Sequence, residues 1–154
     1  MSEPKIAQDE ASIVLVGAFN PAIFHPAWLA RHGLIQDPEA EAADVQLIGG
    51  EVAVIALKWA RIEVTRDRFI VRSNDETHFE PLRDLVVAIF QLLEHTPVTQ
   101  IGINRDIQFE LQTLDEWHKI GHKLAPKDIW LRYLNEPGMA RLSIQSVQIG
   151  RAHV

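Results

Sequence analysis

The sequence contains no cysteine among its 154 residues. That absence excludes disulfide bonds, thiolate metal sites and cysteine nucleophiles, and it fits a reducing compartment. No stretch approaches the roughly 20 apolar residues that an α-helix needs to span a bilayer. The polar N-terminus is not followed by the continuous apolar segment of a signal peptide. We therefore expect a cytoplasmic protein that does not insert into a membrane.

Positive charge is also scarce, with 15 Lys and Arg against 21 Asp and Glu and a net charge of −6. An acidic chain lacks the broad positive field that phosphate backbones attract, so we expect no nucleic-acid partner. Catalytic motifs are missing as well. The chain has no Gly-x-Ser-x-Gly elbow, and its Gly49-Gly50 pair stands outside any phosphate-binding loop.

The last six residues, Ile149–Val154, read Ile-Gly-Arg-Ala-His-Val. This is the translation, in one frame, of a common short-read library adapter, and a stop codon follows in that frame. The adapter requires the preceding codon to end in AG, and Gln148 meets that requirement. We expect 149–154 to be an artefactual tail on a truncated metagenomic fragment, and such residues are excluded from fold reasoning.

Apolar and β-branched residues predict a largely antiparallel sheet after a flexible arm at 1–10. Gly49-Gly50 is typical of a hairpin turn, and the period-two alternation of the following segments leaves one face of the sheet in solvent. The expected strands in this half are Ala11–Phe19, Val45–Ile48, Val52–Leu57, Arg61–Thr65 and Phe69–Ser73.

Further strands are predicted in the C-terminal half. Val98–Ile103 and Ile107–Leu111 are separated by Asn104-Arg105-Asp106, which forms either a turn or a bulge in one long strand. Met139–Val147 is expected to be a last strand. Its natural neighbour would be missing from a truncated chain, so we expect it to have an exposed edge.

One long amphipathic helix is expected at about 81–95, because its apolar residues recur at intervals of three and four. Shorter helices are expected near 26–32, 114–124 and 126–134, and Gln36–Asp44 is expected to be a surface loop. This order of elements predicts an α+β fold with a single domain over 11–148, in which the long helix packs on the sheet.

A possible metal site lies on the helix predicted at 114–124. His118 and His122 have the i, i+4 spacing of a chelating pair, and Asp115 shares their face. A further ligand would come from elsewhere, with His78 and His95 as candidates. The alternative is an ordinary solvated helix face, because Lys119 stands where a zinc protease has its glutamate base.

Two polar segments are further candidates. Arg105, flanked by Asn104 and Asp106, could bind a carboxylate or phosphate, although any tight turn favours the same residue types. The segment Asn74–His78 precedes the long helix. It could be an active-site loop with His78 as base, or simply the linker that starts the helix.

The connection Ile23–Trp28 is unusually apolar. If Phe24 and Trp28 are exposed they form a surface for a partner or ligand, and if they are buried they close one end of the core.

Our leading hypothesis is a non-catalytic binding or interaction domain of a bacterial or phage protein. It would use its sheet edge or the aromatic loop to bind a protein partner or a small ligand, and the exposed edge would also permit oligomers. The alternative is a metal-dependent enzyme that uses Asp115, His118 and His122 to hold zinc or another divalent metal. We expect no other cofactor.

Overall fold

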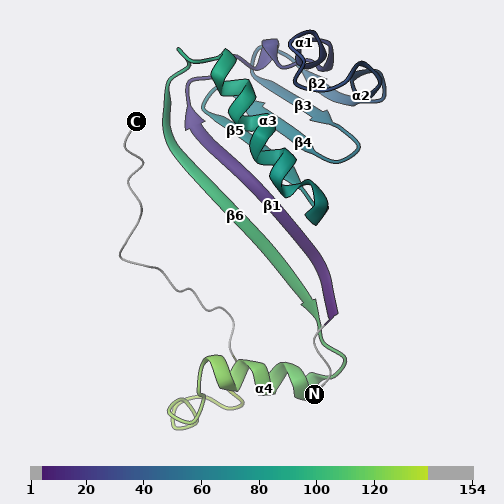
Figure 1. Ribbon diagram of the computed structural model, residues 1–154. Coiled ribbons are helices and arrows are strands. Elements are labelled where there is room, and N and C mark those ends of the chain that lie inside the picture. Colours follow the sequence, from purple (N-terminus) through teal and green to yellow (C-terminus); the bar gives the residue numbers. More distant parts are fainter. Residues whose placement is uncertain (1–4, 139–154) are drawn as a thin grey trace. The chain divides into compact units, whose positions relative to one another are not determined.

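The computed structural model describes residues 5–138, which form two compact units (Figure 1). One unit is Ile6–Phe109, and the other contains Lys5 and, among the described residues, 110–138. The strand expected at Met139–Val147 and the tail at Ile149–Val154 lie outside the described residues. The single domain expected over 11–148 extends past them too, so its limits stay a prediction.

The first unit is built on a six-stranded antiparallel sheet with the strand order β2-β3-β4-β5-β1-β6. The expected α+β class is confirmed. The strands are β1 (Lys5–Gly17), β2 (Asp44–Ile48), β3 (Val52–Ala56), β4 (Arg61–Thr65), β5 (Arg68–Ser73) and β6 (Val98–Glu110).

The middle of the sheet is the expected meander. The chain turns at Gly49-Gly50, where the Gly49 N–H donates to the Val52 carbonyl at 2.9 Å. Strands β3, β4 and β5 follow in continuous antiparallel register, and a bulge between Val45 and Leu47 interrupts β2. Alternate residues of β3, β4 and β5 are buried, which is the period-two pattern that the sequence predicts.

Helix α3 (Phe79–Leu92) lies across one face of the sheet (Figure 1). Its buried side chains are Leu82, Leu85, Val86 and Ile89, each contributing roughly 1.5–3 kcal/mol of transfer free energy. The helix therefore covers the apolar face of the sheet, as expected. The other helical segments of this unit are η1 (Pro21–Ile23), α1 (Pro26–Arg31), α2 (Asp37–Glu41) and η2 (Glu76–His78).

Helix α2 stands where a surface loop was expected at Gln36–Asp44, and that expectation is wrong. The Glu39 carboxylate accepts the Gln36 N–H at 2.8 Å, so the first turn is capped from within the segment. The other Glu39 oxygen accepts from the Trp59 indole at 2.9 Å, which ties the helix to the sheet.

Strand β1 is longer than the expected Ala11–Phe19, because it begins at Lys5 within the segment expected to be a flexible arm. Only Ala11–Val16 pairs with β5. The residues before Ala11 continue beside β6, the other neighbour of β1 in the sheet. Strand β6 is likewise a single strand of 13 residues, so Asn104-Arg105-Asp106 is not a turn.

An aromatic cluster fills the core beneath α3. The Phe69 ring packs edge-on against Phe90 at a centroid distance of 5.2 Å, and Phe19 contacts both rings. Phe24 adds a fourth ring, 5.5 Å from Phe69. These rings join the end of β1, the aromatic loop, β5 and α3 into one packed centre.

The second unit contains α4 (Leu114–Leu124), which matches the helix expected at 114–124. The Thr113 hydroxyl caps it by accepting the Glu116 N–H at 3.2 Å. Residues 128–133 form turns rather than the short helix expected at 126–134. The segment has only isolated backbone hydrogen bonds. So few bonds do not offset the conformational entropy that is lost when a helix is nucleated. Within 5–138 no helix combines the length and the apolar character that a bilayer crossing requires.

The junction of β1 with the segment before β6 is very close. The Ala18 N–H donates to the Pro97 carbonyl at 3.0 Å, and a Cβ placed on Gly17 would lie 2.1 Å from that same oxygen. No side chain fits there without moving the backbone. Gly17 is therefore required by packing.

We predict that Gly17→Ala lowers the free energy of unfolding by about 1–3 kcal/mol, because the added methyl must displace the Pro97 carbonyl. Urea denaturation followed by circular dichroism measures the change. The matched control is Gly50→Ala, since a Cβ there meets nothing within 4 Å. Equal stability of the two variants would contradict the claim that packing against Pro97 requires glycine at position 17.

Candidate functional site

Strand β6 is the outer strand of the sheet, and among residues 5–138 no other strand pairs with its free edge (Figure 1). Four large apolar side chains along it are exposed: Ile101 by 56%, Ile103 by 76%, Ile107 by 40% and Phe109 by 53%. Residues two apart in a strand share a face, so these four form one stripe with Arg105 at its centre. We call these four residues the β6 stripe.

Arg105 is held by neighbours in its own unit. Its guanidinium donates to both Asp9 oxygens, at 2.9 and 2.6 Å, and to Glu76 at 3.4 Å. It also lies over the Phe79 ring, 5.4 Å from the centroid. Because η2 and α3 carry Glu76 and Phe79, the stripe is on the face of the sheet where α3 packs.

These contacts weaken the idea that Arg105 binds an anionic ligand. Two carboxylates already take its donors, one of them through two hydrogen bonds, and an external phosphate or carboxylate would have to displace them. The bridge also lowers the pKa of the Asp9 carboxyl, through the hydrogen bond from Arg105 first and its positive charge second. Arg105 thus clamps β6 to β1 and to the start of α3.

Asn104 and Asp106 flank Arg105 on the opposite face of the strand. The Asn104 amide donates to the Ser12 hydroxyl at 3.4 Å, a second link between β6 and β1. Both side chains are otherwise exposed. The three residues predicted as a binding turn therefore lie together in the middle of an edge strand, and they do not enclose a pocket.

The aromatic loop closes the core. Phe24 is only 1% exposed, and Trp28 packs edge-on against it at 5.8 Å while remaining partly accessible. Beside them opens a hollow of about 470 Å³, lined mainly by apolar side chains that include Phe19, Phe24 and Leu93. The burial of Phe24 matches the core interpretation of this loop rather than the exposed-surface one.

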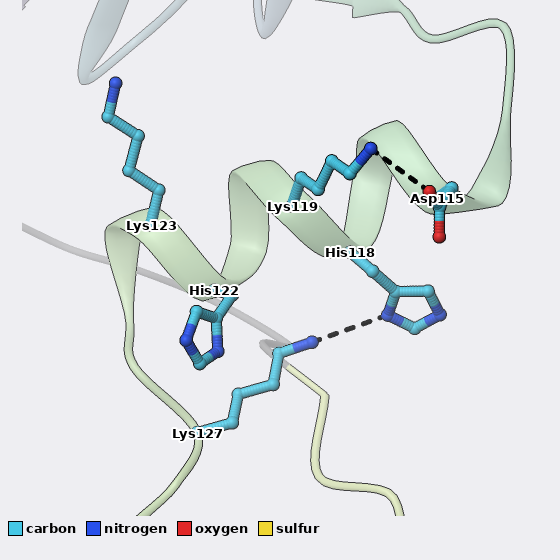
Figure 2. A pocket seen from close by; sticks show the side chains of 6 residues that line it. All are labelled: Asp115, His118, Lys119, His122, Lys123 and Lys127. Carbon is cyan, nitrogen blue, oxygen red and sulfur yellow. Dashed lines mark hydrogen bonds and ion pairs between the residues drawn. The ribbon is translucent and has the colours of Figure 1, made fainter.

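Asp115, His118 and His122 do line one open hollow of about 420 Å³ on α4 (Figure 2). Three lysines line it too. Lys119 pairs with Asp115 at 3.2 Å, and the Lys127 ammonium lies 3.4 Å from His118 Nδ1. In Figure 2 a dashed line joins the Lys127 ammonium to the His118 imidazole, so this ring nitrogen already faces a cation.

Within the described residues no three His, Asp or Glu side chains are grouped closely enough to hold a metal ion. The lysines bring positive charge to the hollow, which opposes cation binding. The metal hypothesis for Asp115, His118 and His122 therefore stays a prediction and gains no support from this arrangement.

The two other histidines named as ligands are engaged or exposed. His78 Nδ1 lies 2.9 Å from Asp75, and its ring stacks on Trp59 at 5.4 Å. Asp75 also accepts the Thr77 N–H at 3.0 Å, so this cluster caps the first turn of η2. His95 is 95% exposed in its side chain and neighbours Glu94. The 74–78 segment accordingly caps and forms η2, which leads directly into α3.

Reasoning from the sequence missed the β6 stripe. The hydrophilic Asn104-Arg105-Asp106 suggested a break, which divided the stripe between two short strands. A signal was present, because the alternation of Ile101 and Ile103 continues in phase through Arg105 to Ile107 and Phe109. If these residues formed a turn, the alternation of apolar residues before it would not be expected to continue in step after it.

Comparisons of the chain with protein-family models, with curated proteins and with solved structures found no match.

The Asp9–Arg105 bridge predicts a pH-dependent coupling between β1 and β6. A carboxyl whose pKa is lowered by folding stabilises the folded state above its ordinary value of 3.8, and this contribution is lost as the pH falls through the lowered value. A double-mutant cycle with Asp9→Asn and Arg105→Met should give a favourable coupling at neutral pH that shrinks progressively as the pH falls below 3.8.

Urea denaturation of the four proteins at neutral pH and at a series of acidic pH values measures this coupling. The double variant serves as the internal control, because it lacks both charges. A coupling that is absent at neutral pH, or unchanged on acidification, would show that the bridge does not hold β6.

Proposed function

We propose that this chain is a non-catalytic interaction domain of a prokaryotic or phage cytoplasmic protein, which binds an extended polypeptide strand along the free edge of β6. The observation that carries the proposal is the β6 stripe on a 13-residue edge strand. In this binding mode main-chain hydrogen bonds to the edge supply affinity, and the side chains of alternate residues supply specificity.

The length of the edge supports the proposal. Only Ala11–Val16 of β1 pairs with β5, whereas β6 has 13 residues. The edge strand is therefore longer than the part of β1 that is paired on its other side. A long run of free N–H and C=O groups offers many hydrogen bonds to an incoming strand.

The lack of protective charge along the β6 stripe supports it further. Proteins commonly protect edge strands with lysines, prolines or inward-pointing charges. The only charged side chain on this face between Ile101 and Phe109 is Arg105, which is turned toward Asp9 and Glu76. An apolar edge left open would be prone to aggregation, so a bound strand is its expected state.

The proposal is tested with a fluorescent peptide of about nine residues, in which threonine and isoleucine alternate to match a strand of ordinary length. Titration with the chain, followed by fluorescence anisotropy, should show saturable binding. Ile103→Lys should weaken binding at least about tenfold, since it sets a charge on the edge.

The matched control is Val87→Lys, which places the same charge on an exposed valine of α3. It should bind like the unchanged chain. Failure of millimolar peptide to bind a chain that sedimentation equilibrium shows to be monomeric, or equal loss of binding in both variants, would overturn the proposed function.

A further inference from the structure

The β6 stripe has a symmetric pattern about Arg105. Ile103 and Ile107 stand two residues to either side, and Ile101 and Phe109 stand four residues to either side. All four are exposed. A strand with this pattern is complementary to itself when a second copy runs antiparallel to it, which is the arrangement that a two-fold axis generates.

Only one register uses the whole pattern. With Arg105 opposite its own copy, Ile101 faces Phe109 and Ile103 faces Ile107, so that every apolar residue of the stripe meets another. A shift of two residues sets Arg105 opposite an isoleucine. A shift of one residue moves the second stripe to the other face of the sheet.

Charge does not oppose this register. Two Arg105 side chains meet at the axis, but each is neutralised by Asp9 in a two-hydrogen-bond bridge and by the nearby Glu76 of its own copy. The cation also rests over its own Phe79 ring. Each guanidinium is thus already held within one copy and compensated before the two strands approach.

The other face of the strand matches as well. In the same register Asn104 stands opposite Asp106 of the second copy, and the relation occurs twice because of the symmetry. An amide is a donor to a carboxylate, and directly opposed side chains in antiparallel strands lie about 4.5–5.5 Å apart at Cβ. No like charges face each other on this side of the strand between Ile101 and Phe109.

We propose that the occupant of the β6 edge is a second copy of this chain, joined antiparallel with Arg105 on the two-fold axis, so that two six-stranded sheets form one continuous sheet. This inference rests on the proposed function of the edge and names its partner. It assigns Asn104, Arg105 and Asp106 to the centre of a self-interface.

The cysteine-free sequence permits a direct test by disulfide trapping in the full chain. Ile103→Cys and Ile107→Cys are made as separate variants and mixed under mild oxidation. The mixture should give the mixed disulfide dimer, because residues 103 and 107 are opposite. Each variant alone should give at least about tenfold less, since two copies of residue 103 would be four residues, about 13 Å, apart along the strands, beyond disulfide reach.

Val87→Cys, mixed with either variant, is the collision control, because Val87 is exposed on α3. Sedimentation equilibrium of the unchanged chain should show a dimer, which Ile103→Lys shifts to monomer while the circular dichroism melt stays cooperative. Trapping of Ile103→Cys with itself, or with Val87→Cys, as readily as with Ile107→Cys would overturn the proposed register.

The outcomes separate the two proposals. A chain that is monomeric at about 100 μM but still binds the alternating peptide, with Ile103→Lys abolishing that binding, would overturn the second copy and keep the strand-binding edge. A monomer that also fails to bind the peptide would overturn both.

Discussion

The pairing of β1 with β6 is the interaction on which the functional edge depends. Beyond Ala11 toward the N-terminus β1 has no partner in β5, so the rest of its length is held by β6. The contacts that position this pair include the Gly17–Pro97 approach at one end, the hydrogen bond of 3.1 Å from the Thr99 hydroxyl to the Val16 carbonyl, and the Arg105–Asp9 bridge further along. In this arrangement the Arg105 side chain in the middle of β6 is bonded to residues of its own unit, while the apolar side chains of the β6 stripe stay exposed.

That arrangement explains why a polar triplet and an apolar edge occur in one strand. Arg105 is a charged residue in the middle of an apolar stripe, but it does not shift the two-residue alternation of the stripe. Its side chain contacts residues of β1, η2 and α3. The strand can therefore present an apolar surface without an uncompensated charge at its centre. A free guanidinium there would instead have favoured an anionic ligand.

Much of the fold was predictable because it follows local periodicity. The meander, the Gly49-Gly50 turn and the long helix all follow from alternation, turn chemistry and the apolar stripe of α3. The length of β1 and β6 was not predictable in the same way. Asp9 belongs to a residue type that is depleted in strands, and its long-range bridge to Arg105 cannot be read from local periodicity.

The candidate site was harder to predict than the fold for a related reason. The strongest local spacing, His118 with His122, led to a metal hypothesis, but Lys127 comes from beyond the helix and its position could not be inferred from that spacing. From the sequence, Phe24 could be either an exposed binding residue or a core residue. In the structure it is buried and packs against Phe69, a residue of a distant strand. To predict that β6 is an edge strand, one must know the order of the strands in the sheet. The periodicity of the sequence does not give that order.

Residue-resolved amide hydrogen exchange along β6, measured at increasing concentrations of the full chain, tests the central claim most directly. An edge strand that is paired only with β1 protects every second amide, while the outward-pointing amides exchange freely. We expect this alternating pattern between Ile101 and Phe109 at high dilution, and protection of the remaining amides as the concentration rises. Uniform protection at every concentration, or no protection at any, would contradict the account of β6 as an open edge that a second copy fills.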